Sequence, residues 1–259
     1  MRVFNDFSAS TIQDVKIYNS ESKSLELFRE KYGIDKIAGD GTDFSKAVKI
    51  MRWIYDNVLH CGGCIDFNTI PKDPISIMDY SFGKDWDKNG VYCGHQAVVF
   101  AECCRSVGLE ARVINGLPFS PCDFDNHVMV MAYLDELSKW VLFDQSNNAY
   151  FTDKNGVALS PLEARHLFGI DEILVSEDLQ PFEKVLFKEK VDPYKEYIAK
   201  NLFYIKFWSY NTLNIDLPEN RMYYLTPMGF DVKERETSLD WFNGQEINIV
   251  SEDQFFCKG

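Results

Sequence analysis

The sequence predicts an α+β fold in which helices come first, antiparallel strands follow, and a later helix leads into aromatic-rich strands. Three observations predict this order. Apolar residues in 43–60 and 94–107 recur at the helical spacings of three and four. Between 111 and 146, short segments rich in β-branched and aromatic residues alternate with polar turns, which is typical of strands. Residues 160–168 then return to a helical pattern.

The first helix is predicted over residues 43–60, with Asp43 as its N-cap. One face of this helix collects its apolar side chains, which are Ala47, Ile50, Met51, Ile54 and Val58. Residues 61–92 follow, and they contain four glycines and two prolines. This composition predicts an irregular, wrapped connection of a length that is often functional.

The second helix is predicted over residues 94–107, directly after Cys93, and Gly108 supplies its stop signal. Its apolar residues cover one side, and Val99 and Phe100 widen that side. A stripe of this width indicates a mostly buried helix. We therefore expect a central helix that is headed by Cys93 and packed on the sheet.

Strands are predicted over residues 111–116, 127–134 and 140–146. If residues 135–138 form a four-residue loop, the last two strands pair as a hairpin with Leu134 opposite Lys139. His127 and Asp144 then become diagonal neighbours on one face, about 7 Å apart at the backbone. A five-residue loop would instead send the two side chains to opposite faces of the sheet.

The rest of the chain continues the same pattern. A further hairpin is expected around 149–159, and a helix then begins at the capping box of Ser160 and Glu163 with Pro161 in its first position. No linker signal divides the chain, so we expect a single domain over 1–259. Its parts are an N-terminal extension (1–43), a catalytic core (44–175) and an aromatic-rich C-terminal part packed on the core (176–259).

Composition excludes some classes of partner. The net charge is -13 and the pI is near 4.8, so phosphate backbones and anionic lipids would be repelled. We expect no nucleic-acid partner and no membrane association, and the residues do not predict an oligomeric state. Seven cysteines, with Cys103 and Cys104 adjacent, do not suggest a disulfide framework. We therefore expect reduced thiols and a cytoplasmic protein.

Cys93 is the candidate nucleophile because it lies at the predicted start of a buried helix. An ordinary thiol with a pKa near 8.5 is only a few per cent thiolate at neutral pH, so it needs stabilisation. The backbone N–H groups and the dipole of a helix start favour an anion. A catalytic cysteine also needs an imidazole and a group that orients it. His127 and Asp144 are the candidates for those two roles.

These residues together carry a family resemblance. The runs "GVYCGHQAVVFAECCRSVGLEARVI", "DNHVMVMAYL" and "KWVLFDQSNNAYFTDKNGVALSPLEAR" resemble the transglutaminase-like superfamily in its bacterial branch, over residues 44–175. The resemblance implies a papain-like α+β fold with Cys93 as nucleophile, His127 as general base and acid, and Asp144 as orienting carboxylate. One departure is Gln145-Ser146, where related proteins commonly show proline and a small polar residue.

The expected function is a cysteine-dependent amide hydrolase or acyl transferase that acts on a peptide or protein amide. The mechanism requires neither a metal nor another cofactor. The backbone N–H of Cys93 is one expected oxyanion donor, with Trp86 and Asn89 as weaker candidates for the substrate or oxyanion site. Two alternatives stay open. One is a binding module that keeps the papain-like cleft, and the other is a structural subunit whose cleft is plugged by residues 61–92.

Other motifs favour plainer interpretations. "HCGGC" (60–64) follows a helix instead of opening one, and it offers three metal ligands where a structural zinc site needs about four. His95 is expected to be structural or a wall of the cleft. Residues 117–126 precede His127 directly, so they should form the rim of the cleft and influence substrate choice.

Overall fold

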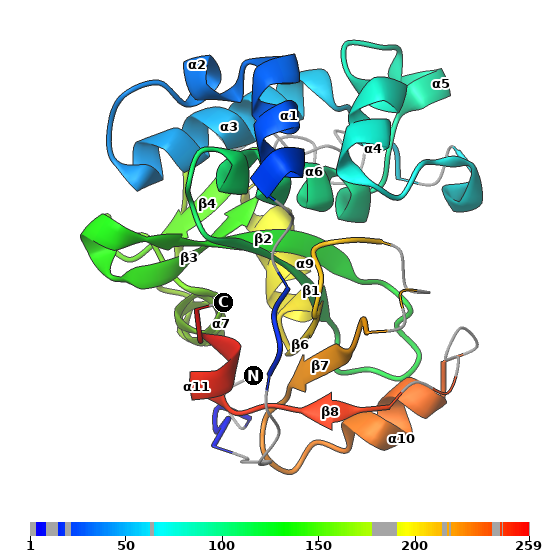
Figure 1. Ribbon diagram of the computed structural model, residues 1–259. Helices are drawn as coiled ribbons and strands as arrows, with labels where there is room; N and C mark the ends of the chain where they lie inside the picture. Colours follow the sequence, from blue (N-terminus) through cyan, green and yellow to red (C-terminus); the bar gives the residue numbers. More distant parts are fainter. Residues whose placement is uncertain are drawn as a thin grey trace.

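The computed structural model describes residues 4–8, 15–18, 22–62, 65–177, 191–213, 217, 219–239, 244 and 246–258. Within these ranges, an eight-stranded sheet separates a layer of N-terminal helices from the helices of the second half of the chain (Figure 1). The α+β fold predicted from the sequence is confirmed.

The N-terminal layer lies at the top of Figure 1. Its elements are α1 (Ser22–Tyr32), α2 (Ile34–Ala38), α3 (Asp43–Asn57), the 3-10 helix η1 (Phe67–Thr69), α4 (Pro74–Ser81), α5 (Trp86–Asn89) and α6 (Cys93–Ser106). The N-cap of α3 is Thr42, whose side chain accepts from the backbone N–H of Ser45, so Asp43 is the first helical residue and not the predicted cap.

Helix α6 lies between the other N-terminal helices and the sheet, as the sequence predicts for the central helix. It begins at Cys93, and every residue from Gly94 to Ser106 is buried. Burial on all sides explains why its sequence is apolar around most of its circumference. The position of Cys93 at the helix start therefore depends on one of the most buried elements of the protein.

The sheet is antiparallel except for one pair. Its strand order is β5-β4-β3-β2-β1-β6-β7-β8, and only β7 and β8 pair in parallel among the described strands. The strands are β1 (Ala111–Leu117), β2 (His127–Leu134), β3 (Lys139–Asp144), β4 (Ala149–Thr152), β5 (Leu174–Val175), β6 (Tyr204–Trp208), β7 (Met222–Leu225) and β8 (Asn248–Ile249).

The hairpin of β2 and β3 has the predicted register. Leu134 pairs with Lys139 across a four-residue loop, which contains the 3-10 helix η2 (Asp135–Leu137). Strand β3 ends at Asp144, two residues before the predicted end. The chain turns over residues 145–148, where Asn148 has a φ of 46° that a strand does not allow.

The two faces of the sheet are covered by different cores. On one face, Val130, Ala132 and Phe143 pack against α6 and the N-terminal helices. On the other face lie α7 (Pro161–Ile170), α9 (Val191–Asn201) and α11 (Glu252–Phe255), in contact with Met129 and Leu142. The capping box predicted for Ser160 and Glu163 opens α7. Helix α10 (Val232–Thr237) contributes to a smaller cluster beside β6 and β7.

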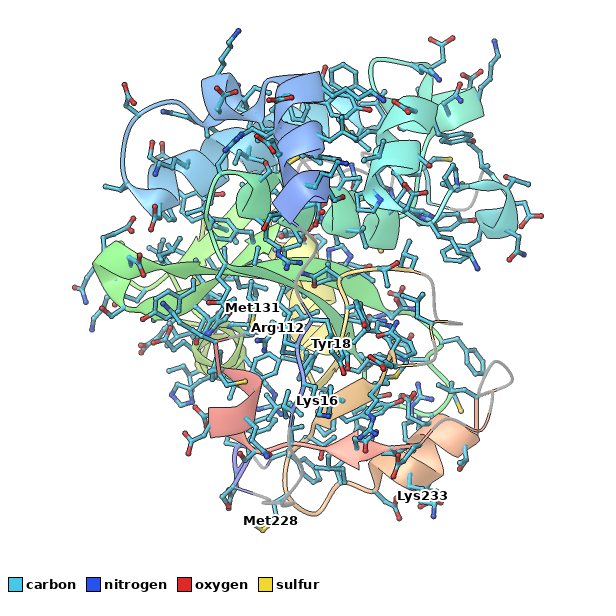
Figure 2. The ribbon with its side chains drawn as sticks, viewed as in Figure 1. Lys16, Tyr18, Arg112, Met131, Met228 and Lys233 are labelled. Atoms are coloured by element: carbon cyan, nitrogen blue, oxygen red, sulfur yellow. The ribbon has the colours of Figure 1, made fainter. Side chains whose placement is uncertain are left out.

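A buried arginine ties the C-terminal residues to this second face. The guanidinium of Arg112 lies over the rings of Trp140 and Phe207, and it donates to the backbone carbonyls of Phe255 and Cys257. In Figure 2, Arg112 and Met131 lie together beneath the sheet, whereas Lys233 lies at the surface. The last helix is therefore held by charge-assisted hydrogen bonds as well as by apolar contacts.

The predicted irregular connection over 61–92 is wrong for part of its length, because α4 and α5 lie within it. Helix α4 begins at Pro74, and the side chain of Asp73 caps it by accepting from the N–H of Ser76. Proline is favoured in the first position of a helix, where its missing N–H is not needed. This proline thus opens a helix and does not mark a loop.

The C-terminal strands extend the sheet formed by β1 to β5, since β6 pairs with β1. The single domain over 1–259 and its division at residues 43 and 175 stay predictions. In the described part of the chain, no helix is both long and apolar enough to cross a membrane.

The expectation of reduced thiols is wrong at one position. Cys61 is disulfide-bonded, and its partner lies outside the described residues. Cys93, Cys103, Cys104, Cys122 and Cys257 are free thiols, as expected. Cys61 follows the end of α3, so the "HCGGC" segment carries a covalent constraint that its sequence did not predict.

Candidate active site

The candidate nucleophile lies at the first position of α6. Tyr92 occupies the N-cap, and its side chain forms no capping hydrogen bond. The Tyr92 side chain therefore leaves the first backbone N–H groups of the helix to interact with an anion at Cys93. As a residue Cys93 is partly exposed, in contrast to the buried Cys103 and Cys104. An anion at this position is favoured by the N–H groups and the dipole of the helix start.

The candidate base and its partner form a buried pair. The Nε2–H of His127 donates to Oδ2 of Asp144 over 2.8 Å, and both side chains are shielded from solvent. Because an ionised carboxylate only accepts, this bond places a proton on Nε2. The other ring nitrogen, Nδ1, is then the one that could exchange a proton with a nucleophile.

Other side chains fix Asp144 and His127 in place. Oδ2 of Asp144 also accepts from the hydroxyl of Tyr194 and from the side-chain amide of Asn147, each over 2.8 Å. The ring of Tyr197 packs edge-on against the ring of His127, with their centroids 5.3 Å apart. Both tyrosines belong to α9, which follows the catalytic core in sequence. The sequence offered no signal for this role beyond the aromatic character of the segment.

The three candidates meet at the ends of the strands. His127 and Asp144 alternate with residues that pack on α6, so they belong to the face that α9 covers. Helix α6 covers the opposite face, yet Cys93 and His127 are close enough for each to shift the pKa of the other. Cys93 begins its helix near the end of β3, where the side chain of Gln145 donates to its carbonyl.

The departure from the family pattern at Gln145-Ser146 has a structural role. The side-chain amide of Gln145 donates to the backbone carbonyls of Cys93 and Val128, over 3.2 and 3.0 Å. The hydroxyl of Ser146 donates to the side chain of Gln96 over 2.7 Å, and Gln96 in turn donates to the carbonyl of Val58. These bonds fasten the start of α6 to the end of β3, and they were not predicted.

Electrostatics favour a thiolate next to a protonated imidazole. Burial alone would raise the pKa of the Cys93 thiol, but hydrogen bonds from His127 and His60, together with their charges, lower it to about 6. Burial alone would lower the pKa of His127, but the Asp144 carboxylate and the Cys93 thiolate raise it to about 10. The same pairing holds the pKa of Asp144 below its usual range against the effect of burial.

The remaining sequence candidates lie around this site. Trp86 is 57% exposed on α5, and Asn89 ends that helix four residues before Cys93. Among the contacts recorded for the described residues, neither reaches the triad, so their role in an oxyanion site stays a prediction. His95 is fully buried beside the rings of Phe67 and Tyr92, and burial lowers its pKa to about 4.

His60 contacts the site although the sequence gave it no catalytic role. Its imidazole helps to lower the pKa of the Cys93 thiol. The signal in the sequence was indirect, because His60 appeared there only as a possible metal ligand in "HCGGC". The described residues contain no group of three or more His, Cys, Asp or Glu side chains that could hold a metal ion.

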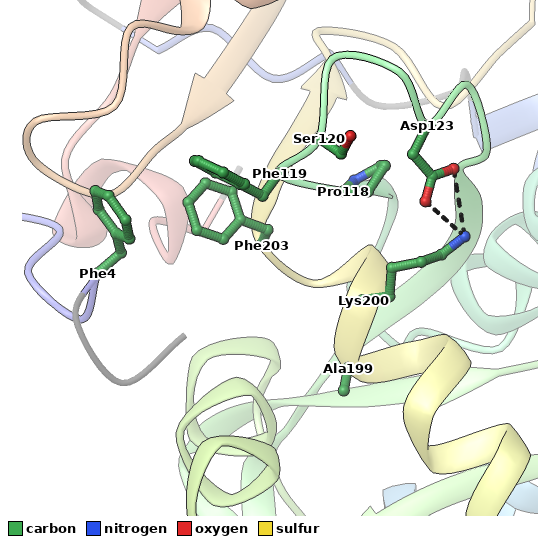
Figure 3. Close-up of a pocket in the computed structure, with 8 residues that line it drawn as sticks. All are labelled: Phe4, Pro118, Phe119, Ser120, Asp123, Ala199, Lys200 and Phe203. Carbon is green, nitrogen blue, oxygen red and sulfur yellow. Dashed lines mark hydrogen bonds and ion pairs between the residues drawn. The ribbon is translucent and has the colours of Figure 1, made fainter.

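The loop predicted to form the rim of the cleft lines an apolar pocket of about 390 Å³. Figure 3 shows the rings of Phe119 and Phe203 next to each other there, with Phe4 on the far side. Lys200 closes one edge through its ion pair with Asp123. Lys200 also lies over the ring of Tyr197, the residue that contacts His127, so the pocket borders the candidate site through α9.

Comparisons with known proteins find similarity in this part of the chain. Residues 31–145 match the family model of the transglutaminase-like superfamily. The matched segment includes Cys93, His127 and Asp144. It also begins earlier than the residue 44 expected from the sequence.

One curated relative is the peptide-N(4)-(N-acetyl-beta-glucosaminyl)asparagine amidase of Gallus gallus, 28% identical over 102 residues. The match covers 38% of this chain and only 13% of that protein. Two solved structures are also similar. A candidate cysteine protease from Cytophaga hutchinsonii has 20% identity and a TM-score of 0.37, covering 59% of this chain and 49% of that one. A candidate protease from Parabacteroides distasonis has 15% identity and a TM-score of 0.29, covering 58% and 35%.

Proposed function

We propose that this protein is a cysteine-dependent amide hydrolase or acyl transferase that acts on a peptide or protein amide through Cys93, His127 and Asp144. The observation that carries the proposal is the imidazole of His127, which donates to the buried Asp144 carboxylate and whose charge lowers the pKa of the thiol at the start of α6. The relative from Gallus gallus supports it, because its name describes an amidase.

The chemistry begins with the thiolate of Cys93. It attacks the carbonyl carbon of the substrate amide, a C–S bond forms, and the π electron pair moves to the carbonyl oxygen. The imidazolium of His127 gives its proton to the amide nitrogen as the C–N bond breaks, and ammonia or an amine leaves. Asp144 keeps the ring oriented and stabilises its positive charge throughout.

The thioester is then resolved by water or by a second amine. Neutral His127 takes a proton from the incoming nucleophile, which attacks the acyl carbon. The C–S bond breaks and the thiolate returns. Addition of water makes the net reaction an amide hydrolysis, and addition of an amine makes it an acyl transfer. The backbone N–H of Cys93 is one donor to the oxyanion in both half-reactions.

Trapping of an acyl adduct tests this function. Wild type and Cys93→Ala are exposed to peptides that carry glutamine, asparagine or glycosylated side chains, and the intact mass of each protein is recorded. We expect an adduct on Cys93 of the wild type and none on the variant. The same adduct on both proteins would remove Cys93 from the mechanism.

The alternative is a non-catalytic module that binds peptides in the same cleft. A structural subunit whose cleft is plugged by residues 61–92 stays the second alternative. A binding module would show no difference in thiol reactivity between Cys93 and the buried Cys104. A cytoplasmic location stays a prediction, and the disulfide at Cys61 argues against it because disulfides persist in oxidising compartments.

A further inference from the structure

The segment that follows α3 runs directly beside the segment that leads into α6. The N–H of Val91 donates to the carbonyl of Leu59 over 2.9 Å, and the N–H of Cys61 donates to the carbonyl of Val91 over 2.8 Å. His60 lies between these two bonds and pairs with Val91 in a parallel bridge. The backbone of His60 is therefore fixed beside Val91, which lies two residues before Cys93 in the sequence.

Close packing holds the two segments together. A Cβ placed on Gly90 would lie 2.5 Å from the Cβ of Cys61 and 2.4 Å from the carbonyl oxygen of Trp86, so only glycine fits there. Cys61 is itself disulfide-bonded. His60 thus sits on a backbone that is constrained on both sides, which is the preorganisation that a catalytic group needs.

His60 belongs to the segment that pairs with Val91, whereas His127 begins β2, and both imidazoles lower the pKa of the Cys93 thiol. The charged or titratable groups around His60 are the Cys93 thiol, His95 and, near His95, Lys72. Imidazole carries at least one N–H in both of its protonation states. His60 can therefore donate a hydrogen bond to the reacting centre over a wide pH range.

We propose that His60 is a further catalytic residue, which donates to the Cys93 sulfur in the resting enzyme and to the carbonyl oxygen of the substrate once that oxygen becomes negative. The inference rests on the proposed function and names the second oxyanion donor, beside the backbone N–H of Cys93. When the C–S bond forms, the negative charge moves from sulfur to the adjacent oxygen. A donor that already points at the sulfur then lies next to the new charge.

Two reactions of Cys93 separate the roles of His60. Alkylation by iodoacetamide needs only the thiolate, because carbon displaces iodide without an oxyanion. Acylation by p-nitrophenyl acetate forms a tetrahedral oxyanion, and its leaving group departs without a proton from His127. For His60→Ala at pH 7 we expect alkylation to slow about tenfold, because one charge-assisted hydrogen bond is lost. We expect acylation to slow by about 10²–10³, the usual cost of one oxyanion donor.

Two further variants serve as controls for the rates of His60→Ala. His60→Gln retains an N–H donor, so its acylation rate should be at least about tenfold higher than that of His60→Ala. His166→Ala removes an exposed histidine on α7 and should leave both rates unchanged. Thermal unfolding of each variant identifies any rate loss that follows from misfolding.

The outcomes also distinguish the two proposals. Equal losses in alkylation and acylation, or no loss in His60→Ala, would overturn the role of His60 as an oxyanion donor while leaving the triad in place. A wild type that forms no acetyl adduct on Cys93 would overturn the proposed function and this inference together. A larger loss in acylation than in alkylation, with partial recovery in His60→Gln, supports both.

Discussion

Single side chains set the reactivity of this site by their charge. Asp144 is the critical one, because its carboxylate accepts from His127, Tyr194 and Asn147 and keeps its negative charge in a buried position. That charge holds His127 protonated, and the imidazolium in turn stabilises the Cys93 thiolate. The thiolate and imidazolium form as pH rises through about 6 and persist until His127 loses its proton near pH 10.

Asp144→Asn should narrow this pH window from both sides. Without the carboxylate, the pKa of His127 falls from about 10, and the pKa of Cys93 rises from about 6 towards that of an ordinary thiol. We expect iodoacetamide to alkylate Cys93 at least about tenfold more slowly at pH 7. The rate is followed by intact mass spectrometry between pH 5 and 10. Asp153→Asn, in an exposed turn, is the control, and an unchanged profile in Asp144→Asn would contradict the electrostatic role.

Individual residues also show how far the sequence predicts the geometry of the candidate site. A helix start at Cys93 and a hairpin register that puts His127 and Asp144 on one face were predicted, and their catalytic roles stay a proposal. Gln145, Tyr194 and His60 were not predicted. Each acts across a contact between segments that lie far apart in sequence, or through the turn that replaces the end of the predicted third strand. No local periodicity carries that information.

Among the elements, the approach of α9 to the sheet determines how His127 is packed. Gly116 pairs with His127 across β1 and β2, and a Cβ on Gly116 would lie 2.1 Å from the carbonyl oxygen of Asn201, the last residue of α9. This contact is with backbone and cannot be relieved by a side-chain rotation. Helix α9 therefore comes as close to the strand as a residue without a side chain permits.

Gly116→Ala should push α9 away from β1 and lower the stability of the fold. We expect a loss of about 1–3 kcal/mol, the usual cost of overpacking, which corresponds to a fall in Tm of a few degrees. Thermal unfolding followed by circular dichroism measures it. At Gly94 a Cβ would meet Leu213 at 3.4 Å, an ordinary contact, so Gly94→Ala is the matched control for stability. Equal melting temperatures for Gly116→Ala and wild type would refute the close approach.

The elements also show why boundaries were harder to predict than element types. The helices around 43–60 and 94–107 and the hairpin of β2 and β3 were predicted because their apolar periodicity is strong. Helices α4 and α5 were missed because they are short and lie in a segment rich in glycine and proline. Helix α4 is stabilised by packing of Ile77 and Met78 on the N-terminal core, which a local pattern does not show.

At the scale of the whole molecule, the C-terminal residues pack in the core on the second face of the sheet. Arg112 connects β1 to the carbonyls of Phe255 and Cys257, although more than 140 positions separate them in sequence. The sequence predicted that the aromatic C-terminal part packs on the core. It did not predict that β6 to β8 continue the same sheet, because strand pairing over such separations leaves no local signal.

Arg112→Leu should release the C-terminal helix α11. Two buried carbonyls would lose their donor, so we expect a loss of roughly 2–4 kcal/mol and faster proteolytic cleavage near residue 250. Limited chymotrypsin digestion, which can cleave after Phe255 and Phe256, measures this by mass analysis of the fragments, and Lys233→Ala, at the exposed surface, is the control. Cleavage at the same rate in Arg112→Leu and in the control would show that the C-terminal helix is held by other contacts.

The pH dependence of alkylation at each cysteine of the wild type is the most direct test of a thiolate held by His127 at the start of α6. Iodoacetamide is added between pH 5 and 10, and peptide mass spectrometry gives the rate at Cys93 and Cys104 separately. We predict that Cys93 reacts with a midpoint near pH 6, while Cys104, whose pKa burial raises, stays unmodified at neutral pH. A midpoint for Cys93 above pH 8, or equal rates at the two cysteines, would contradict it.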